Sequence, residues 1–215
     1  MKMEKIVIIG SSVAAISAIE TIREKNKNLH ITVITTEKDL FYSRPLISYA
    51  DLTDGQRYYR DKNFFRKNNV DLIFSEATSV KNNSAVLKNK KNVKFSKLLL
   101  AVGGKPIIPP TVAGINGKNV FTLTTVEDAD NIRKFCKNKK HAVVIGCGMI
   151  GIKAAEFLKC LGLDVSIVEL MAQPFASVLD DKSGKIIADE IKKHAKLILN
   201  NSVYEIKENQ CILKN

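Results

Sequence analysis

The chain has 215 residues, 45% of them apolar, and a formal net charge of +12. This length accommodates one large domain or two small ones. Met1-Lys2-Met3-Glu4 leads straight into a strand and no apolar run could span a bilayer, so we expect no signal peptide, no membrane segment and a cytoplasmic protein. The four cysteines (136, 147, 160 and 211) have no Cys-x-x-Cys pair and no metal-ligand spacing with a histidine, which indicates idle thiols and no metal site.

The positive charge has two interpretations. It could attract acidic partners or nucleic acid. The lysines, however, are mixed with asparagine and acidic residues along the chain, with no basic tail and little aromatic interleaving. A lysine-rich proteome bias explains that pattern better, so we expect no nucleic-acid partner.

The chain begins with a nucleotide-type βαβ pattern. Residues 5–9 predict a buried strand, and residues 10–15 predict the turn into a helix that reaches about Lys25. Residues 31–35 predict the next strand, after which Glu37 is the candidate acid for an adenosine ribose. The turn is a weak Gly-x-Gly-x-x-Gly motif, with Ser12 and Ala15 where two glycines would stand.

Short elements follow this first motif. We expect a helix at about 61–67 and strands near 71–74, 77–81, 84–88 and 93–95, with asparagine turns that suggest one antiparallel meander. Residues 97–102 predict a buried strand that ends in Gly103-Gly104. The proline-rich segment from there to Gly117 predicts a linker between domains.

A stronger motif opens the second half. A β-branched run at 142–145 breaks into Gly146-x-Gly148-x-x-Gly151 and a helical pattern. The glycines permit a tight turn, close approach of the backbone to a pyrophosphate, and close packing of helix on strand. The helix N-terminus offers N–H groups to phosphates, and Glu169 ends the next strand, where an acid accepts ribose hydroxyls. The alternative is a glycine-rich turn that only tightens a βαβ unit.

The remaining residues repeat the order of the first half. They predict a helix near 182–194, a strand at 196–200 and a second meander at 203–206 and 211–213. We therefore predict an α/β fold with two Rossmann-like dinucleotide-binding domains, each with an antiparallel β-meander. We place the domains at residues 1–112 and 113–215, the second of them incomplete.

Five segments together resemble a family of flavoproteins. They are residues 10–15 with Glu37, residues 42–48 (Tyr-Ser-Arg-Pro-Leu-Ile-Ser), residues 100–106, residues 124–129 and residues 146–169. Along its whole length the chain is similar to the pyridine nucleotide–disulfide oxidoreductases. The resemblance implies FAD on the first unit and NADH on the second, with hydride passing from the nicotinamide to the flavin. It implies these cofactor-binding residues: Gly10, Ser12, Ala14, Ala15, Glu37, Arg44, Pro45, Ala101, Val102, Gly103, Gly146, Gly148, Ile150, Gly151 and Glu169.

The resemblance also implies a chemistry without thiols. Disulfide- and peroxide-reducing members of the family carry cysteine just after the second strand, where this chain has Ser43-Arg44. Dithiol relay and peroxidatic chemistry both need a thiolate and are therefore removed. Arg44 would lie near the flavin, where a fixed cation favours the anionic reduced ring. The alternative is a surface arginine before a turn proline.

Two positions depart from the pattern of the ferredoxin reductases. Those enzymes have a lysine at the place of Tyr49 and a glutamate at the place of Lys153, which pair at the flavin edge. Here the positive charge moves to the nicotinamide side, so the candidate catalytic residues are Arg44, Lys153 and Tyr49. Alternatively, Lys153 points outward from its helix.

The resemblance implies an electron acceptor of the rubredoxin or ferredoxin type, or a nitrite or sulfite reductase centre, and leaves oligomers possible. A later segment that completes the family's FAD domain is not among these residues, so we expect a truncated chain with weakly bound FAD and an open strand edge. The alternative function is a truncated, non-catalytic nucleotide-binding or interaction module.

Overall fold

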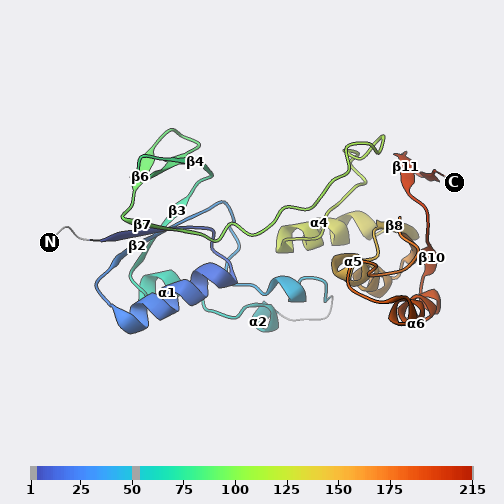
Figure 1. Cartoon of the computed structure of the whole chain (residues 1–215), viewed down its shortest axis with the longest axis horizontal. Coiled ribbons are helices and arrows are strands. Elements are labelled where there is room, and N and C mark those ends of the chain that lie inside the picture. The colour runs from blue at the N-terminus through green and yellow to red at the C-terminus, as the bar shows by residue number, and fades with distance from the viewer. Residues whose placement is uncertain (1–3, 50–53, 215) are drawn as a thin grey trace. The chain divides into compact units, whose positions relative to one another are not determined.

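A computed structural model describes residues 4–49 and 54–214 of the chain. The chain forms two compact α/β units, each built on a parallel sheet (Figure 1). The first unit comprises Met1–Ser43 and Leu52–Lys105, and the second comprises Arg44–Asp51 and Pro106–Asn215. The expected α/β fold class is confirmed, whereas the domain boundary at residue 112 stays a prediction.

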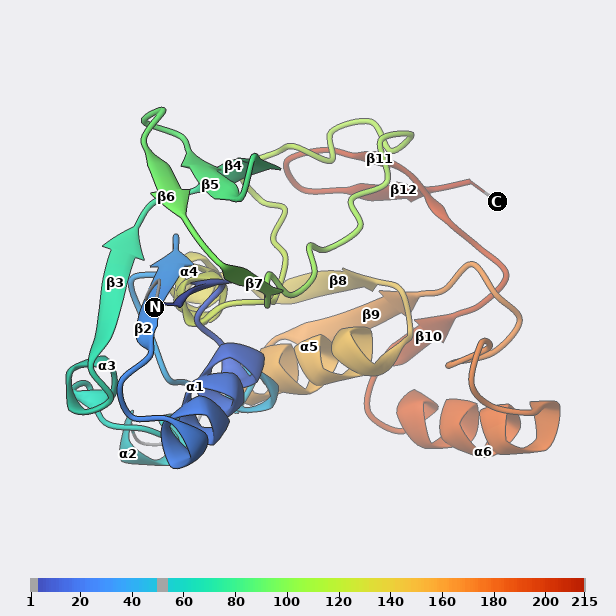
Figure 2. The same cartoon turned by 60° about the vertical axis from the view of Figure 1, so that its left-hand side comes forward.

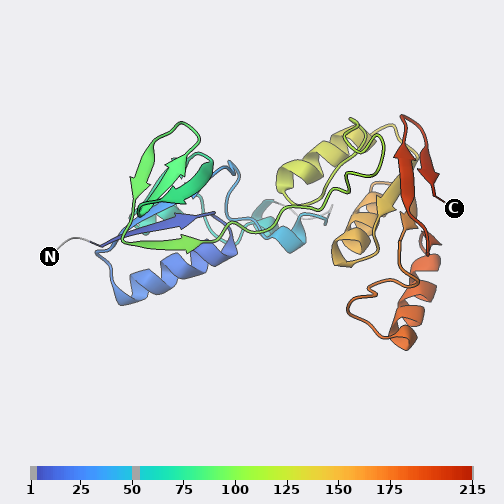
Figure 3. The same ribbon diagram turned by 45° about the horizontal axis from the view of Figure 1, so that its top comes forward.

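The sheet of the first unit has the order β3-β2-β1-β7, and all its neighbours are parallel. Its strands are β1 (Lys5–Ile9), β2 (His30–Thr35), β3 (Val70–Phe74) and β7 (Lys97–Leu100). Helices α1 (Val13–Lys25) and α3 (Phe64–Lys67) cover one face of this sheet, and Figure 3 shows α1 lying along it. Ile8, Ile16 and Ile19 are buried there. The β-branched residues of β1 and β2 thus fill the core that a doubly wound sheet requires.

An antiparallel meander covers the opposite face of this sheet. It consists of β4 (Ala77–Lys81), β5 (Ser84–Leu87) and β6 (Asn92–Lys94). Ala85 and Leu87 point inward and pack against Val7 and Ile34 of the parallel sheet. In Figure 2 the meander forms a separate layer beyond the sheet.

Three predictions for the first unit were wrong in detail. The strand near 71–74 pairs in parallel with β2 and does not belong to the meander, because a short apolar run suits either a parallel or an antiparallel partner. The helix expected from residue 61 begins at Phe64, because Asp61 forms a turn in which its Oδ1 accepts from Asn63 N (2.7 Å). The last strand ends at Leu100 and is half-exposed, because β7 is an edge of the sheet.

Two short elements lie between β2 and α3. They are a 3-10 turn at Arg44–Leu46, which groups with the second unit, and α2 (Asp54–Arg57) of the first unit. The sequence at residues 51–55 is mostly polar, and residues 51–53 lie outside the described residues.

The second unit repeats the pattern of the first, as predicted. Strands β8 (His141–Ile145), β9 (Asp164–Val168) and β10 (Lys196–Ile198) form a parallel sheet of order β10-β9-β8. Helices α5 (Met149–Cys160) and α6 (Asp181–Lys192) cover one face with Val144, Val165 and Ile167 at the centre. The hairpin of β11 (Val203–Ile206) and β12 (Cys211–Leu213) joins a smaller apolar cluster with Val168.

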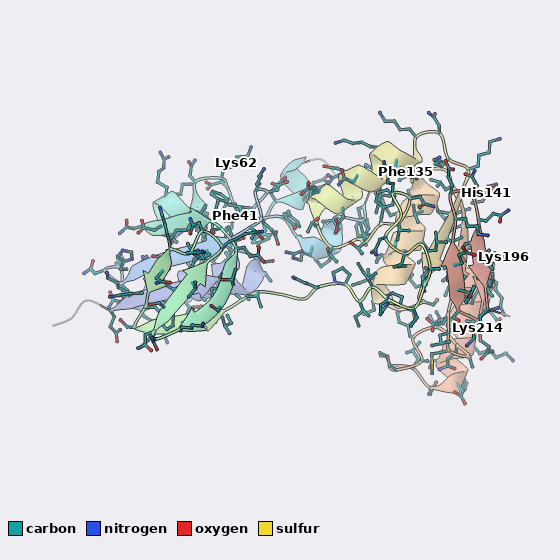
Figure 4. All side chains as sticks on the ribbon, turned by 90° about the horizontal axis from the view of Figure 1, so that it is seen from above. Phe41, Lys62, Phe135, His141, Lys196 and Lys214 are labelled. Atoms are coloured by element: carbon teal, nitrogen blue, oxygen red, sulfur yellow. The ribbon has the colours of Figure 1, made fainter. Side chains whose placement is uncertain are left out.

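The sequence analysis missed two helices, the short α2 and the longer α4 (Val126–Cys136), to which the labelled Phe135 belongs in Figure 4. Thr125 caps α4 by accepting from Asp128 N (3.1 Å), while the Asp128 carboxylate accepts from Thr125 N (3.0 Å). This reciprocal capping box was the readable signal. Arg133 of α4 lies over the ring of Phe157 on α5, 4.9 Å from its centroid. No helix in the described part of the chain is long and apolar enough to cross a membrane.

Candidate functional site

The glycine loop of the second unit joins β8 to α5 with the geometry of a dinucleotide-binding turn. Gly146 N donates to Val168 O at 2.8 Å, which ties the loop to the end of β9. A Cβ on Gly151 would lie 2.1 Å from the carbonyl oxygen of Gly146, so only glycine lets α5 approach the strand this closely. Gly148 caps the helix without any side-chain hydrogen bond, and Ile150 in the first turn is exposed. The N–H groups of this turn are therefore directed to a ligand or water.

Glu169 closes this loop from the end of β9. Its Oε2 accepts from Cys147 N at 2.6 Å, and its Oε1 accepts from Met171 N at 2.9 Å. A carboxylate oxygen can accept two hydrogen bonds, so each oxygen of Glu169 could still accept one from a ribose hydroxyl. The carboxylate is thus held beside the glycine loop at the carboxyl edge of the sheet, where such folds bind nucleotides.

The first unit repeats this turn with other side chains. Gly10 N donates to Ile34 O at 2.8 Å, as Gly146 does to Val168. Gly10 has φ +108°, and a Cβ there would lie 2.0 Å from the carbonyl oxygen of Ala101. Ser12 caps α1 with no side-chain hydrogen bond, Ala15 is fully buried in the place of Gly151, and Ala14 is exposed.

The segment after β7 reaches the same edge of the first unit. Ala101 N donates to Ile9 O at 2.8 Å, so Ala101 extends the ladder beside the glycine turn. Val102 is exposed and Gly103 has φ +67°. The structure therefore brings Gly10, Ser12 and Ala101 together at the carboxyl ends of β1 and β7.

Glu37 lies two residues past the end of β2, further along than we expected from Glu169. The ladder pairing makes Thr35, not Glu37, the counterpart of Glu169. Thr35 Oγ1 accepts from Glu37 N at 3.1 Å and contacts Ser11 Oγ at 2.8 Å. The carboxylate of Glu37 accepts from the Tyr42 hydroxyl at 3.0 Å.

An open cavity of about 500 Å³ lies beyond the ends of β2 and β3. It is lined by Thr36, Lys38, Phe74, Ser75, Glu76 and Lys88. Phe74 is 59% exposed and offers an apolar ring surface beside charged side chains. The combination suits a flat heteroaromatic ring with a polar edge. Sequence patterns did not indicate this cavity.

The residues at 44–49 group with the second unit. Arg44 Nη1 donates to Thr124 O at 2.6 Å, just ahead of α4. Lys153 Nζ, on α5, donates to the Tyr49 hydroxyl at 3.1 Å and lies 4.8 Å from the centroid of the same ring. Pro45 is exposed at the 3-10 turn. Tyr49 and Lys153 thus meet, while Arg44 is anchored separately.

Glu156 completes the surroundings of Lys153. Its Oε2 accepts from Lys153 Nζ at 2.7 Å, one turn along the helix. The hydrogen bonds that Lys153 donates to Glu156 and then to Tyr49 raise its pKa, so the ammonium stays charged at neutral pH. The sequence analysis did not single out Glu156, although the i,i+3 spacing from Lys153 was readable.

Cys147, inside the glycine loop, is fully buried. Burial, followed by the nearby Glu169 carboxylate, raises its pKa to about 11. This thiol therefore remains protonated at neutral pH and is not a nucleophile. Among the residues that the structure describes, no cluster of His, Cys, Asp or Glu is arranged to hold a metal ion.

We compared the sequence with those of known proteins. A family model described as "Pyridine nucleotide-disulphide oxidoreductase" matches residues 4–215. A protein of Methanocaldococcus jannaschii named NADH oxidase is 33% identical, over 93% of this chain and 48% of its own length. The NADH-dependent phenylglyoxylate dehydrogenase subunit epsilon of Aromatoleum evansii is 36% identical, over 88% of this chain and 45% of its own.

A solved structure shows the same arrangement of elements. The crystal structure of NADH:rubredoxin oxidoreductase from Clostridium acetobutylicum is 29% identical and superposes with a TM-score of 0.79. The match covers 94% of this chain and 53% of that one. The chain thus spans about half the length of the relatives that it matches.

Proposed function

The chain belongs to the pyridine nucleotide-disulphide oxidoreductase family, and on that premise we propose that it carries the FAD and NADH sites of an oxidoreductase. The observation that carries this proposal is the repetition of one turn, from Gly10 in the first unit and from Gly146 in the second. Each turn joins a parallel strand to a helix whose cap leaves the first N–H groups open. A chain with two such turns fits two dinucleotides.

The first unit fits FAD. Gly10 lets the turn pack against Ala101, and the N-cap Ser12 makes no side-chain hydrogen bond to the first N–H groups of α1, which leaves them for a pyrophosphate. The cavity beside Phe74 and Lys38 has the size and chemistry for the adenine end. Ala101, Val102 and Gly103 border the same edge of the sheet. We assign these residues, with Ala14, Ala15 and Glu37, to FAD.

The second unit fits NADH. We assign the pyrophosphate to the N–H groups after Gly146, Gly148 and Ile150, and the adenosine ribose to Glu169. The carboxylate already has one backbone partner on each oxygen, so its position is fixed before a ligand arrives. A negative charge there repels the 2′-phosphate of NADPH and favours NADH.

Three further side chains of the second unit are our candidates for the reacting end. FAD supplies the hydride-accepting chemistry when bound. We propose that Lys153 provides a fixed cation on the nicotinamide side and that Tyr49 orients it, because both its contacts restrain the ammonium. We assign Arg44 and Pro45 to the charge and shape of the cofactor site, with the guanidinium held by Thr124.

We propose a small redox protein of the rubredoxin or ferredoxin type, or a nitrite or sulfite reductase centre, as the electron acceptor. The likeness to NADH:rubredoxin oxidoreductase supports the first class. The buried, protonated Cys147 and the Ser43-Arg44 pair support an electron route that uses no thiol.

Anaerobic titration of the FAD-loaded chain with NADH tests this proposal. We expect the flavin absorbance near 450 nm to be bleached by NADH and much less by NADPH (~tenfold in the concentration needed). Flavin that binds but is not bleached would support the rival function, a non-catalytic nucleotide-binding module, which the serine at position 12 favours. Gly146→Val, which fills the turn of the second unit, is the matched control and should abolish bleaching while FAD remains bound.

A further inference from the structure

The basic residues are not evenly distributed along this chain. Residues 77–126 contain eight lysines and no acidic residue, so about a quarter of the chain carries eight of the +12 charges. The mixing of lysines with acids that we expected from composition therefore fails in this stretch. Five of the eight lysines lie on the β4-β5-β6 meander or its turns: Lys81, Lys88, Lys90, Lys91 and Lys94. We call these five residues the basic face.

The strand register directs the side chains of Lys81 and Lys94 away from the core. Lys81 pairs with Ser84 across β4 and β5, and Ser84 pairs with Lys94 across β5 and β6. Paired residues project to the same side of a sheet, so the two lysines flank Ser84 in one row. Ala85 and Leu87, at 0% and 3% exposure, project to the other side and bury against the parallel sheet. The row with Lys81 and Lys94 is therefore the outer surface of the meander.

The basic face is almost without counter-charges. All five ammonium groups belong to exposed residues. Among the described residues, one ion pair involves this face: Lys88 Nζ lies 3.2 Å from Glu76 Oε2. Like charges on neighbouring strands repel each other and lower the stability of a sheet. Apart from the Lys88–Glu76 pair, no ion pair compensates for this repulsion among the described residues.

The meander of the second unit supplies an internal comparison. Residues 203–214 contain two lysines and two glutamates, so that hairpin has no net charge. The two meanders follow the parallel strands in the same order. A general bias toward lysine would have given both meanders a positive net charge, but only the meander of the first unit has one.

We propose that the basic face is a docking surface for a protein partner with an acidic surface. The face consists of strands and their turns. Of the neighbouring aromatic rings, Phe95 packs inward with Leu87 and Val7, and Phe74 lines the cavity that we assign to adenine. It thus lacks the stacking rings of single-strand binders and the helix that enters a DNA groove. Lysine instead of arginine suits a weak complex that forms quickly by electrostatic attraction.

Binding of a fluorescent poly-L-glutamate chain, measured by anisotropy at about 0.1 M salt without NADH, tests the proposal. The face variant replaces Lys81, Lys90, Lys91 and Lys94 with Gln. The control variant makes the same change in net charge at exposed lysines of the second unit, with Lys182, Lys185, Lys192 and Lys196 replaced by Gln. A third variant carries Lys→Arg at the four face positions and keeps the charge. A short duplex DNA serves as the competing class of ligand.

We expect the face variant to bind poly-L-glutamate about tenfold more weakly, the control within about twofold of the parent, and the Lys→Arg variant like the parent. Equal losses in the face and control variants would overturn the proposal, because net charge alone would explain them. Duplex DNA that binds much more tightly than poly-L-glutamate, with the same loss in the face variant, would overturn the assignment to a protein. Because no NADH is present, these outcomes are independent of whether the chain reduces flavin.

Discussion

The two units have the same βαβ frame but close its nucleotide end in different ways. At the strand end, the second unit has Glu169, whose carboxylate accepts from Cys147 N and Met171 N. At the equivalent place the first unit has Thr35, which contacts Ser11 and accepts from Glu37 N. A hydroxyl and a carboxylate thus occupy equivalent places at the strand end, and only the carboxylate adds a negative charge there.

The two sheets also differ at one edge. In the first unit β1 lies between β2 and β7, and Val7 is 1% exposed. In the second unit the corresponding strand β8 has β9 on one side and no partner on the other among the residues that the structure describes, and Val143 and Ile145 are 43% and 44% exposed. Strands with similar sequences are therefore buried or half-exposed according to their neighbours, which the strands themselves do not encode.

The largest expected effect contrasts a crowded turn with an open one. Gly10→Ala places a Cβ against Ala101 O at a backbone φ of +108°, so we expect a loss of about 3 kcal/mol or more in the unfolding free energy. Gly148→Ala in the other turn has nothing within 4 Å of the new Cβ, and we expect a change within about 0.5 kcal/mol. Chemical denaturation of both variants measures the difference. Equal stabilities would mean that the two turns are equally tolerant and that the contrast is false.

The charge at the strand end is the next test of the comparison. Glu169→Gln removes the negative charge and keeps an acceptor oxygen for only one of the two backbone N–H groups of Cys147 and Met171, so we expect the preference for NADH over NADPH to fall about tenfold. Glu37→Gln in the first unit is the control and should leave that preference unchanged. Dissociation constants from fluorescence titration give both values. An unaltered protein that binds NADPH as well as NADH would contradict the role assigned to Glu169.

A smaller effect is expected at Lys153. Lys153→Met removes the cation from Tyr49 and Glu156, and we expect the rate of flavin reduction by NADH to fall about fivefold, in line with ~1 kcal/mol for such contacts. Because the pKa of Lys153 is raised, the ammonium is retained across the neutral range and lost only when the pH exceeds that raised value. The rate should therefore show no titration by this group between about pH 6 and 9.

Tyr49→Phe separates the two contacts of Lys153, because it keeps the ring and removes the hydroxyl. We expect a reduction rate between those of the parent and Lys153→Met in stopped-flow measurements. If the Lys153→Met variant binds NADH and reduces flavin as fast as the parent, Lys153 is a surface residue with no role in the reaction.

The sequence predicted the repeated βαβ units and the glycine turns because these depend on local spacing. It failed where partners are distant in the chain. The strand at Val70–Phe74 is a short run bounded by turns like its meander neighbours, and only its pairing with β2 distinguishes it. Likewise, nothing near Arg44 indicates that it would group with the second unit, 80 residues from its partner Thr124. That positions 49 and 153 lie together was indicated by the family resemblance and not by the local sequence. The helix α4 was a different kind of error, because its capping box was present in the local sequence.

The smallest expected effect concerns Cys147, which differs from Ser11 at the equivalent position of the first turn only by sulfur in place of oxygen. Cys147 occupies the position of Ser11, is fully buried, and has a pKa of about 11, so at pH 7.5 about one thiol in three thousand is ionised. We expect an alkylating agent to modify the exposed Cys160 first and to leave Cys147 and the NADH-dependent reduction of ferricyanide largely unchanged, as peptide mass spectrometry and a rate assay would show. Cys147→Ser, which makes the second turn resemble the first, should change NADH affinity by less than about threefold, because the backbone N–H to Glu169 remains. If alkylation abolishes activity even with saturating NADH and Cys147→Ser restores resistance, the thiol is reachable and reactive, and the equivalence of the two turns fails at this residue.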